Sequence, residues 1–124
     1  MYQIRFYKDK NGNSPVKDHL DALLSRSDKD SRINANKILE CFAHLKRFGH
    51  RAKEPYAKNL GKSGIWELRP VRGRILYTAW NGNIFILLHI FMKDTQKTPI
   101  REIKQAERFL GDIKGRGLKD ATVE

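Results

Sequence analysis

Arginine and lysine are the residues of this 124-residue chain whose number and spacing point most directly to chemistry. Together they total 25, against 14 Asp and Glu, and the formal net charge is +11. The excess is concentrated in residues 44–74, where nine Lys and Arg face only Glu54 and Glu67. Such a concentration indicates a binding site for nucleic acid, an anionic membrane surface or an acidic protein.

Two of these arginines flank one short connection between predicted strands, Arg69 before it and Arg74 after it. Arginine is a costly choice inside a sheet, because its charge must be paired or solvated there. Two guanidinium groups at one turn, with Lys93 and Lys97 just past the partner strand, can clamp a phosphodiester and stabilise charge that develops on it. A solvated surface charge is the alternative reading, above all for the two lysines.

Acid–base and metal chemistry have fewer candidates. Glu54 and Glu67 are the carboxylates near these cations that can serve as a general base, although an ion pair with Arg69 or Arg74 explains Glu67 better. The four histidines are scattered, and His89, inside an apolar strand, is expected in the core. No spacing of His, Cys or Asp matches a metal site, so we expect neither a metal nor a cofactor.

Composition and length set the remaining limits. Cys41, the single cysteine, falls on the apolar side of a helical pattern, which predicts a buried thiol in a reducing compartment. The first residues are charged rather than signal-like, and no apolar run approaches the ~20 residues of a membrane span. We therefore expect a cytoplasmic protein with no membrane contact. The length suits a single domain at residues 1–118 and a short polar tail at 119–124.

The elements that position these side chains follow from the pattern along the chain. A first strand is expected at residues 2–7, and a turn cluster follows it at 9–12. Ser14 and Pro15 then form a cap-and-proline helix start. Two helices are expected, ending near residues 25–27 and at Gly49, which would form a hairpin with one apolar stripe.

Three strands are expected next, at residues 65–69, 74–80 and 84–91, and Asn81-Gly82 joins the last two as a hairpin. The third is nearly all apolar, as a central strand covered on both faces would be. Thr98 and Pro99 open a last helix. The order β-α-α-β-β-β-α predicts an α+β fold: a small antiparallel sheet packed on the helical hairpin, with the helices mostly on one side and the other face free.

Three segments of the chain resemble the RelE/ParE toxin superfamily, in its HigB-like, phage-derived branch. They read EPYAKNL at 54–60, IWELRPVRGRILY at 65–77 and LLHIFMKDTQKTP at 87–99, in the family's order and spacing. The resemblance covers nearly the whole chain and implies a RelE-like fold. It also implies the toxin of a type II toxin–antitoxin system: a metal-independent, ribosome-dependent endoribonuclease that inhibits translation by cleaving messenger RNA, through attack of a 2′-OH on the adjacent phosphate.

The resemblance implies roles for individual residues. Arg74 matches the arginine that contacts the scissile phosphate, and Arg69 matches the arginine that closes the WELR-type strand. Lys93 matches the first lysine of the F-x-K-x-T-Q-K-T-P segment, and Glu54 the glutamate that some relatives use as a base. These four are the expected catalytic residues. The expected RNA-binding residues are Lys53, Lys58, Lys62, Arg72 and Lys97.

The implied partners are a cognate antitoxin, the ribosome and messenger RNA, with promoter DNA reached only through the antitoxin. Two other functions stay open at this point. One is a non-enzymatic toxin of the ParE type that binds DNA gyrase, and the other is a plain RNA-binding module. The arginine pair and the K-x-x-x-K-T-P end favour the ribonuclease, because gyrase binders of this superfamily generally lack that clamp and a plain module does not explain the positioned arginines.

Overall fold

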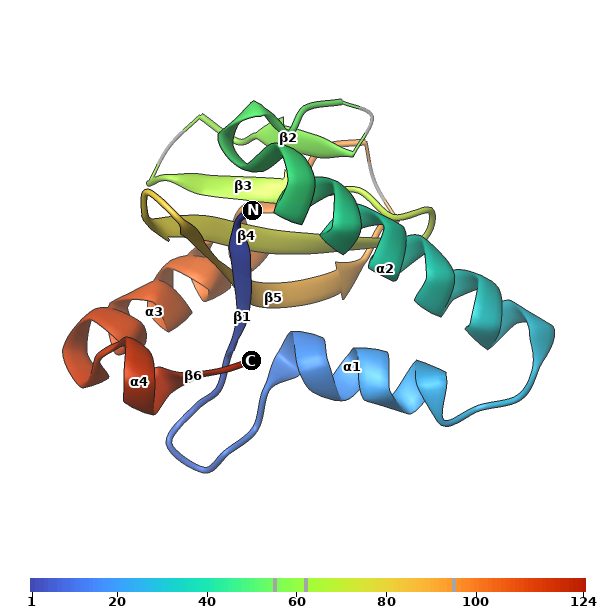
Figure 1. Ribbon diagram of the computed structural model, residues 1–124, viewed down its shortest axis with the longest axis horizontal. Coiled ribbons are helices and arrows are strands. Elements are labelled where there is room, and N and C mark those ends of the chain that lie inside the picture. The colour runs from blue at the N-terminus through green and yellow to red at the C-terminus, as the bar shows by residue number, and fades with distance from the viewer. Residues whose placement is uncertain (55, 62, 95) are drawn as a thin grey trace.

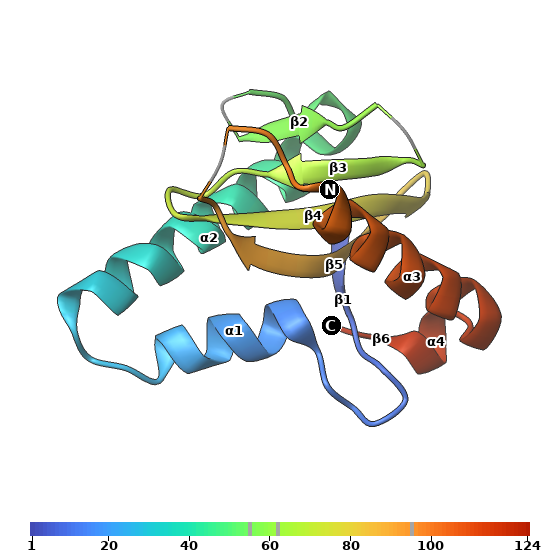
Figure 2. The same ribbon diagram turned by 180° about the vertical axis from the view of Figure 1, so that it is seen from behind.

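The fold is a six-stranded sheet with helices on both faces, as Figure 1 shows and Figure 2 shows from behind. It is seen in a computed structural model that describes residues 1–54, 56–61, 63–94 and 96–124. The strands are β1 Gln3–Tyr7, β2 Ala57–Asn59, β3 Ile65–Leu68, β4 Gly73–Asn81, β5 Ile84–Met92 and β6 Thr122–Val123. The helices are α1 Pro15–Leu24, α2 Lys29–Phe48, the 3-10 turn η1 Gly49–Arg51, α3 Ile100–Arg116 and α4 Leu118–Ala121.

The sheet order is β2-β3-β4-β5-β1-β6, and the sheet is mixed. The predicted antiparallel run β3-β4-β5 is confirmed, and so is the hairpin between β4 and β5, although its loop is Gly82-Asn83 and Asn81 still pairs with Ile84. The expectation of a small, wholly antiparallel sheet is wrong, because β1 inserts beside β5 and runs parallel to it. A parallel pair needs a long crossover, and residues 8–83 supply one that contains both helices of the hairpin.

The two edge strands were not expected. β2 pairs with β3, and β6 pairs with β1, so the segment expected as a polar tail closes one edge of the sheet instead. Thr122 is 2% exposed, and its hydroxyl accepts a hydrogen bond of 2.6 Å from Arg5 Nε and donates one of 2.6 Å to the carbonyl of Leu118. The bond between Arg5 and Thr122 joins residues 117 positions apart, which a local sequence pattern cannot reveal.

The core has two halves, one on each face of the sheet. On the face covered by α1 and α2, the side chains of Leu45, Leu68 and Leu87 belong to one apolar cluster. On the face covered by α3, Leu76 and Leu88 pack with Ile113 in a second cluster. The expectation of helices mostly on one side, with a free face opposite, is therefore wrong, because α3 lies across the sheet from α1 and α2. Side chains alternate along each strand, so both faces are apolar over most of their area.

The helices begin and end close to the predicted positions, but the predicted capping hydrogen bonds at Ser14 and Thr98 are not formed. Asp28 caps α2 by accepting a hydrogen bond from the backbone N–H of Ser31 at 3.0 Å. Gly49 ends that helix with a φ of 54°. Ser14 lies at the start of α1 as predicted, but its hydroxyl donates to the carbonyl of Tyr7 at 2.6 Å instead of capping the helix. The predicted cap at Thr98 is wrong as well, because Pro99 is the N-cap of α3.

The predicted burial of Cys41 is confirmed, and burial raises the pKa of its thiol to about 11. Within the part of the chain that the structure describes, no helix is long and apolar enough to cross a membrane.

Candidate functional site

Four side chains of alternating charge lie in a row at the end of β3, and we call this row the charge chain: Glu54, Arg69, Glu67 and Arg74. Arg69 lies between two carboxylates, with its Nη1 at 3.6 Å from Glu54 Oε1 and its Nε at 3.7 Å from Glu67 Oε1. The same Glu67 oxygen is 3.8 Å from Nε of Arg74. The predicted ion pairing of Glu67 is therefore confirmed with both arginines. The Glu67 side chain is 4% exposed, so its charge is held almost entirely by these neighbours.

Strand alternation explains why two charges are buried here. Leu68 and Ile75 face α1 and α2, so their neighbours Glu67 and Arg74 point toward the α3 side of the sheet. The guanidinium of Arg74 is fixed further by its Nη1, which donates to the carbonyls of Pro70 and Gly73, both at 2.8 Å. Burial lowers the pKa of Arg74, an effect that Glu67 opposes. An arginine nevertheless stays charged in a protein, so Arg74 presents a fixed cation.

A small hollow opens beside this pair, and we call it the Arg74 hollow. It is a surface hollow whose empty space, open solvent included, is about 190 Å³, and the residues that line it are Glu67, Arg74, Phe91, Lys93, Gln96, Lys97 and Thr98. The hydroxyl of Thr98 donates to Glu67 Oε2, which ties the segment before α3 to β3. The backbone N–H of Lys93 donates to the carbonyl of Arg72 at 3.1 Å, which ties the end of β5 to the β3–β4 connection.

The composition of the Arg74 hollow favours an anion. Three of its lining residues carry positive charge, and the single carboxylate among them is occupied by two arginines and a threonine. A guanidinium held in place by backbone carbonyls, with two lysines on flexible stems beside it, suits a phosphate group. A phosphodiester that gains charge during attack would gain stabilisation from the same groups.

The structure brings some of the predicted site residues together. Arg74, Lys93 and Lys97 all line the Arg74 hollow, and Arg69 reaches it through Glu67. Glu54 does not line it; this side chain is 65% exposed at the far end of the charge chain. The catalytic roles expected for Arg69, Arg74, Lys93 and Glu54 stay predictions.

The predicted RNA-binding residues are more dispersed. Lys58 lies opposite Glu67 in the β2–β3 register and is exposed, and Lys53 is exposed in the segment before β2. Arg72 is also exposed, but it lines a different hollow, on the α1 and α2 side of the connection. Lys62 lies outside the described residues. These contacts with RNA stay predictions.

Sequence reasoning missed Gln96 and Thr98, although both lie in the segment that carries Lys93 and Lys97. Thr98 was assigned to a helix cap, because a threonine before a proline is a local signal and its bond to Glu67 is not. His89 is partly buried in β5, and its Nε2 is 2.8 Å from Glu102 Oε1. Its Nδ1 is buried without a hydrogen-bond partner among the described residues. The prediction of a core histidine therefore holds only in part: the ring is partly buried and pairs with a carboxylate that the sequence did not show, but it belongs to neither apolar cluster.

Comparison with known proteins identifies the family of this chain. The family model described as Phage derived protein Gp49-like (DUF891) matches residues 23–110, a range that contains α2, the run β2-β3-β4-β5 and every residue that lines the Arg74 hollow. No curated protein matches the chain. Proteins of the Gp49-like family are RelE/toxin-like and are linked to toxin–antitoxin toxins. With most of its length matched, this chain belongs to the phage-derived Gp49-like family.

Proposed function

We propose that this protein is the toxin of a type II toxin–antitoxin system, of the HigB-like kind, and that it is a ribosome-dependent endoribonuclease that inhibits translation in the cytoplasm. The observation that carries the proposal is the Arg74 hollow, where a buried and braced guanidinium meets two lysines. Its place within the matched Gp49-like range supports the toxin assignment. The proposed partners are a cognate antitoxin, the ribosome and messenger RNA, with promoter DNA reached through the antitoxin.

The proposed reaction uses the RNA's own 2′-OH. Its oxygen attacks the adjacent phosphorus, the bond to the 5′-oxygen breaks, and the products are a 2′,3′-cyclic phosphate and a 5′-OH. Nη2 of Arg74 makes no hydrogen bond to a described residue, so it is available to a phosphate oxygen. Lys93 and Lys97 add positive charge where the pentavalent phosphorus becomes more negative.

Proton transfer needs a base for the 2′-OH and an acid for the 5′-oxygen. Glu67 is an unsuitable base, because it is occupied by Arg69, Arg74 and Thr98; it positions Arg74 instead. Glu54 remains the proposed base, since it is exposed and held by one arginine contact at 3.6 Å, from which it can turn toward bound RNA.

Primer extension on a defined messenger RNA, with and without programmed ribosomes, tests the proposal. We expect cuts within codons when ribosomes are present. Arg74→Lys keeps a charge but lacks the two-pronged guanidinium, and we expect a loss of cleavage of about 100-fold or more. Lys93→Ala should lose about 10-fold. Lys29→Ala, an exposed lysine at the start of α2, is the matched control and should cleave as the native chain does.

Two outcomes would contradict the ribonuclease. If folded protein leaves RNA intact on programmed ribosomes, the activity is absent, and a DNA gyrase supercoiling assay then tests the ParE-type alternative. If Arg74→Lys and Lys93→Ala cleave as well as Lys29→Ala does, the Arg74 hollow is not the catalytic site.

Lys58 tests the RNA-binding surface next to the hollow. Removing a phosphate contact weakens binding and flattens its salt dependence. For Lys58→Ala we expect the slope of log affinity against log salt concentration to fall by about 0.7–0.9. The measurement is binding of the chain to ribosomes at several salt concentrations, with Lys29→Ala as the control. An unchanged slope would place Lys58 outside the interface.

A further inference from the structure

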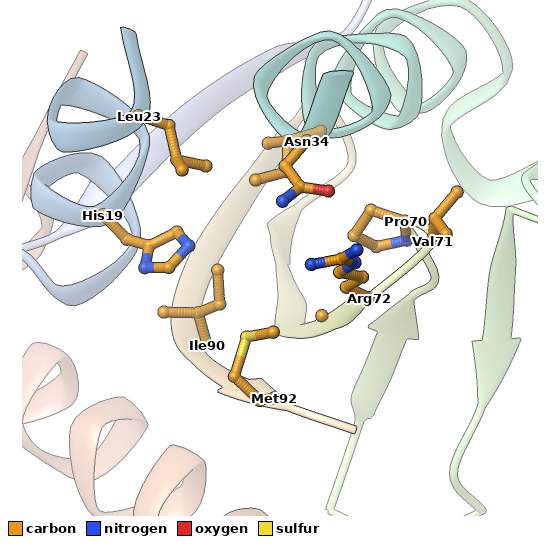
Figure 3. Close-up of a pocket in the computed structure, with 10 residues that line it drawn as sticks. His19, Leu23, Asn34, Pro70, Val71, Arg72, Ile90 and Met92 are labelled. Carbon is orange, nitrogen blue, oxygen red and sulfur yellow. The ribbon is translucent and has the colours of Figure 1, made fainter. Parts of the chain in front are cut away.

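A second hollow lies behind the connection that holds Arg74, and we call it the Arg72 hollow (Figure 3). It lies between α1, α2, the β3–β4 connection and the end of β5, and its empty space, open solvent included, is about 300 Å³. Figure 3 shows His19 and Leu23 on α1, Asn34 on α2, and Val71 and Arg72 on the connection, arranged around it. Of the residues that line it, Arg72 is the one to which the sequence assigned a role, as a predicted RNA contact.

The rim of the Arg72 hollow is apolar and open to solvent. Val71 is 66% exposed and Met92 is 57% exposed, and Leu24, next to the lining residue Leu23, is exposed as well. Single exposed apolar side chains are ordinary on a protein surface. Several around one concave site mark a surface that contacts another protein.

The polar groups of the hollow all offer hydrogen-bond donors. Arg72, Asn34 and His19 extend toward it from three sides, and their side chains make no hydrogen bond or ion pair with any described residue. No Asp or Glu is among the described residues that line it. Burial lowers the pKa of His19, so its imidazole is neutral near pH 7 and carries one N–H. A carboxylate fits this set of donors.

We propose that the Arg72 hollow binds an acidic, amphipathic segment of the antitoxin. Apolar side chains of the segment pack on Val71 and Met92, and a carboxylate contacts Arg72 and Asn34. The net charge of +11 on this chain favours an acidic partner over a second copy of itself. The inference rests on the proposed function, because it takes the partner to be an antitoxin.

The Arg72 hollow lies on the opposite side of the β3–β4 connection from the Arg74 hollow, so a segment bound there contacts the residues that hold Arg74. The carbonyls of Pro70 and Gly73 hold Arg74, and the carbonyl of Arg72 holds the backbone of Lys93. Pro70, Arg72 and Gly73, whose carbonyls make these contacts, also line the Arg72 hollow. A segment bound there contacts the element that positions Arg74 and leaves the Arg74 hollow itself uncovered.

Calorimetric titration of the native chain with the purified protein encoded by the adjacent reading frame tests the proposal. Val71→Glu places a carboxylate on the rim, and we expect its Kd for that protein to rise about 30-fold. Val71→Lys should weaken binding less, because its charge attracts an acidic segment. Leu39→Glu changes an exposed leucine of α2 that does not line the hollow, so its Kd should stay within about twofold.

The outcomes separate this inference from the ribonuclease. Without the partner, Val71→Glu should cleave RNA as the native chain does, and with the partner present it should resist inhibition. If the native chain cleaves no RNA but Val71→Glu still weakens partner binding, the docking site stands and the ribonuclease fails.

Four results would overturn the docking site. The first two are equal Kd values for Val71→Glu and Leu39→Glu, and no binding of the adjacent protein to the native chain. The third is a homodimer in light scattering that Val71→Glu abolishes, which would assign the hollow to a second copy. The fourth is loss of ribosome binding in Val71→Glu while partner binding is unchanged, which would assign it to RNA.

Discussion

Helices cover both faces of the sheet, but the two faces differ in whether they bury charged side chains. The face under α1 and α2 buries a continuous apolar cluster. The face under α3 is apolar in its middle but buries Glu67 and Arg74 at one end. The N-terminal end of α3 lies there, and Ile100, its first residue, is exposed instead of packing on that end of the sheet.

The difference shows where the sheet gives up stability to bury charge. Burying a carboxylate and a guanidinium costs free energy that a well-packed apolar pair would not cost. The α1 and α2 face avoids that cost, whereas the α3 face accepts it where the Arg74 hollow opens. Buried, paired charges beside a hollow are the arrangement expected of a functional site.

Removing one partner of the buried pair should have the largest effect on stability. Glu67→Ala leaves Arg74 buried without its carboxylate, and we expect the free energy of unfolding to fall by about 4 kcal/mol. Glu54→Ala is the matched control, because it removes an exposed carboxylate from the same charge chain and should cost less than about 1 kcal/mol. Urea unfolding of both variants measures the difference, and equal losses would mean that the pair is not effectively buried.

Two adjacent leucines compare the apolar parts of the faces directly. Leu87 belongs to the cluster under α1 and α2, Leu88 to the cluster under α3, and both are fully buried. Leu87→Ala and Leu88→Ala should each lower the free energy of unfolding by about 3 kcal/mol. Denaturant midpoints at fixed slope give these values. A loss below about 1 kcal/mol for Leu88→Ala would show that the side chains under α3 are not tightly packed around Leu88.

Two glycines offer the next comparison. Gly49 has a φ of 54°, and a Cβ there would lie 2.1 Å from the ring of Tyr2, so Gly49→Ala should cost about 2 kcal/mol. Gly111 lies in α3 with open space around it, so Gly111→Ala should raise the stability by about 0.5–1 kcal/mol. Thermal unfolding of the two variants should therefore shift in opposite directions. A shift in the same direction would contradict the close packing of Tyr2 on Gly49.

An effect smaller than that of Gly49→Ala concerns the far end of α3 and depends on pH. Bonds from Arg116 and Tyr7 lower the pKa of Asp112 to about 2. Because the folded pKa lies below the unfolded value, this carboxylate contributes stability above about pH 4 and loses it as the pH falls toward 2. Asp112 is partly exposed, so Asp112→Asn should cost about 1 kcal/mol at pH 7. Unfolding of the variant and of the native chain, measured from pH 7 to pH 2, should show the difference between their free energies of unfolding shrinking toward zero. A difference that stays constant would contradict the ion pair.

Much of this arrangement could be predicted from local sequence. The hairpin between β4 and β5 was predicted from Asn81-Gly82, and in the structure its loop is Gly82-Asn83, with the Asn81 side chain accepting a hydrogen bond from the backbone N–H of Asn83 at 3.0 Å. Gly49 ends α2 with a positive φ, as a glycine after a helix predicts. The convergence of Arg74 with Lys93 followed from that hairpin, because it brings the end of β5 beside the start of β4.

What could not be predicted depends on contacts between distant segments. An amphipathic helix pattern shows that α3 buries one side, but not which face of the sheet it covers. A strand pattern likewise does not name its neighbour, so the parallel insertion of β1 was not foreseen. Arg72 lies between two predicted site arginines, yet the turn of the connection directs it to the opposite hollow. Glu54 is close in sequence to the basic cluster but outside the Arg74 hollow.

The position of β1 has a consequence for how this protein is made. β1 is translated before both of its neighbours in the sheet, β5 and β6, and β6 is residues 122–123. β1 therefore has no strand to pair with until β5 has been made, and the six-stranded order is completed only after β6 has been made. Pairing of β1 is therefore a late step in the folding of the nascent chain, although β1 is made before every other strand of the sheet.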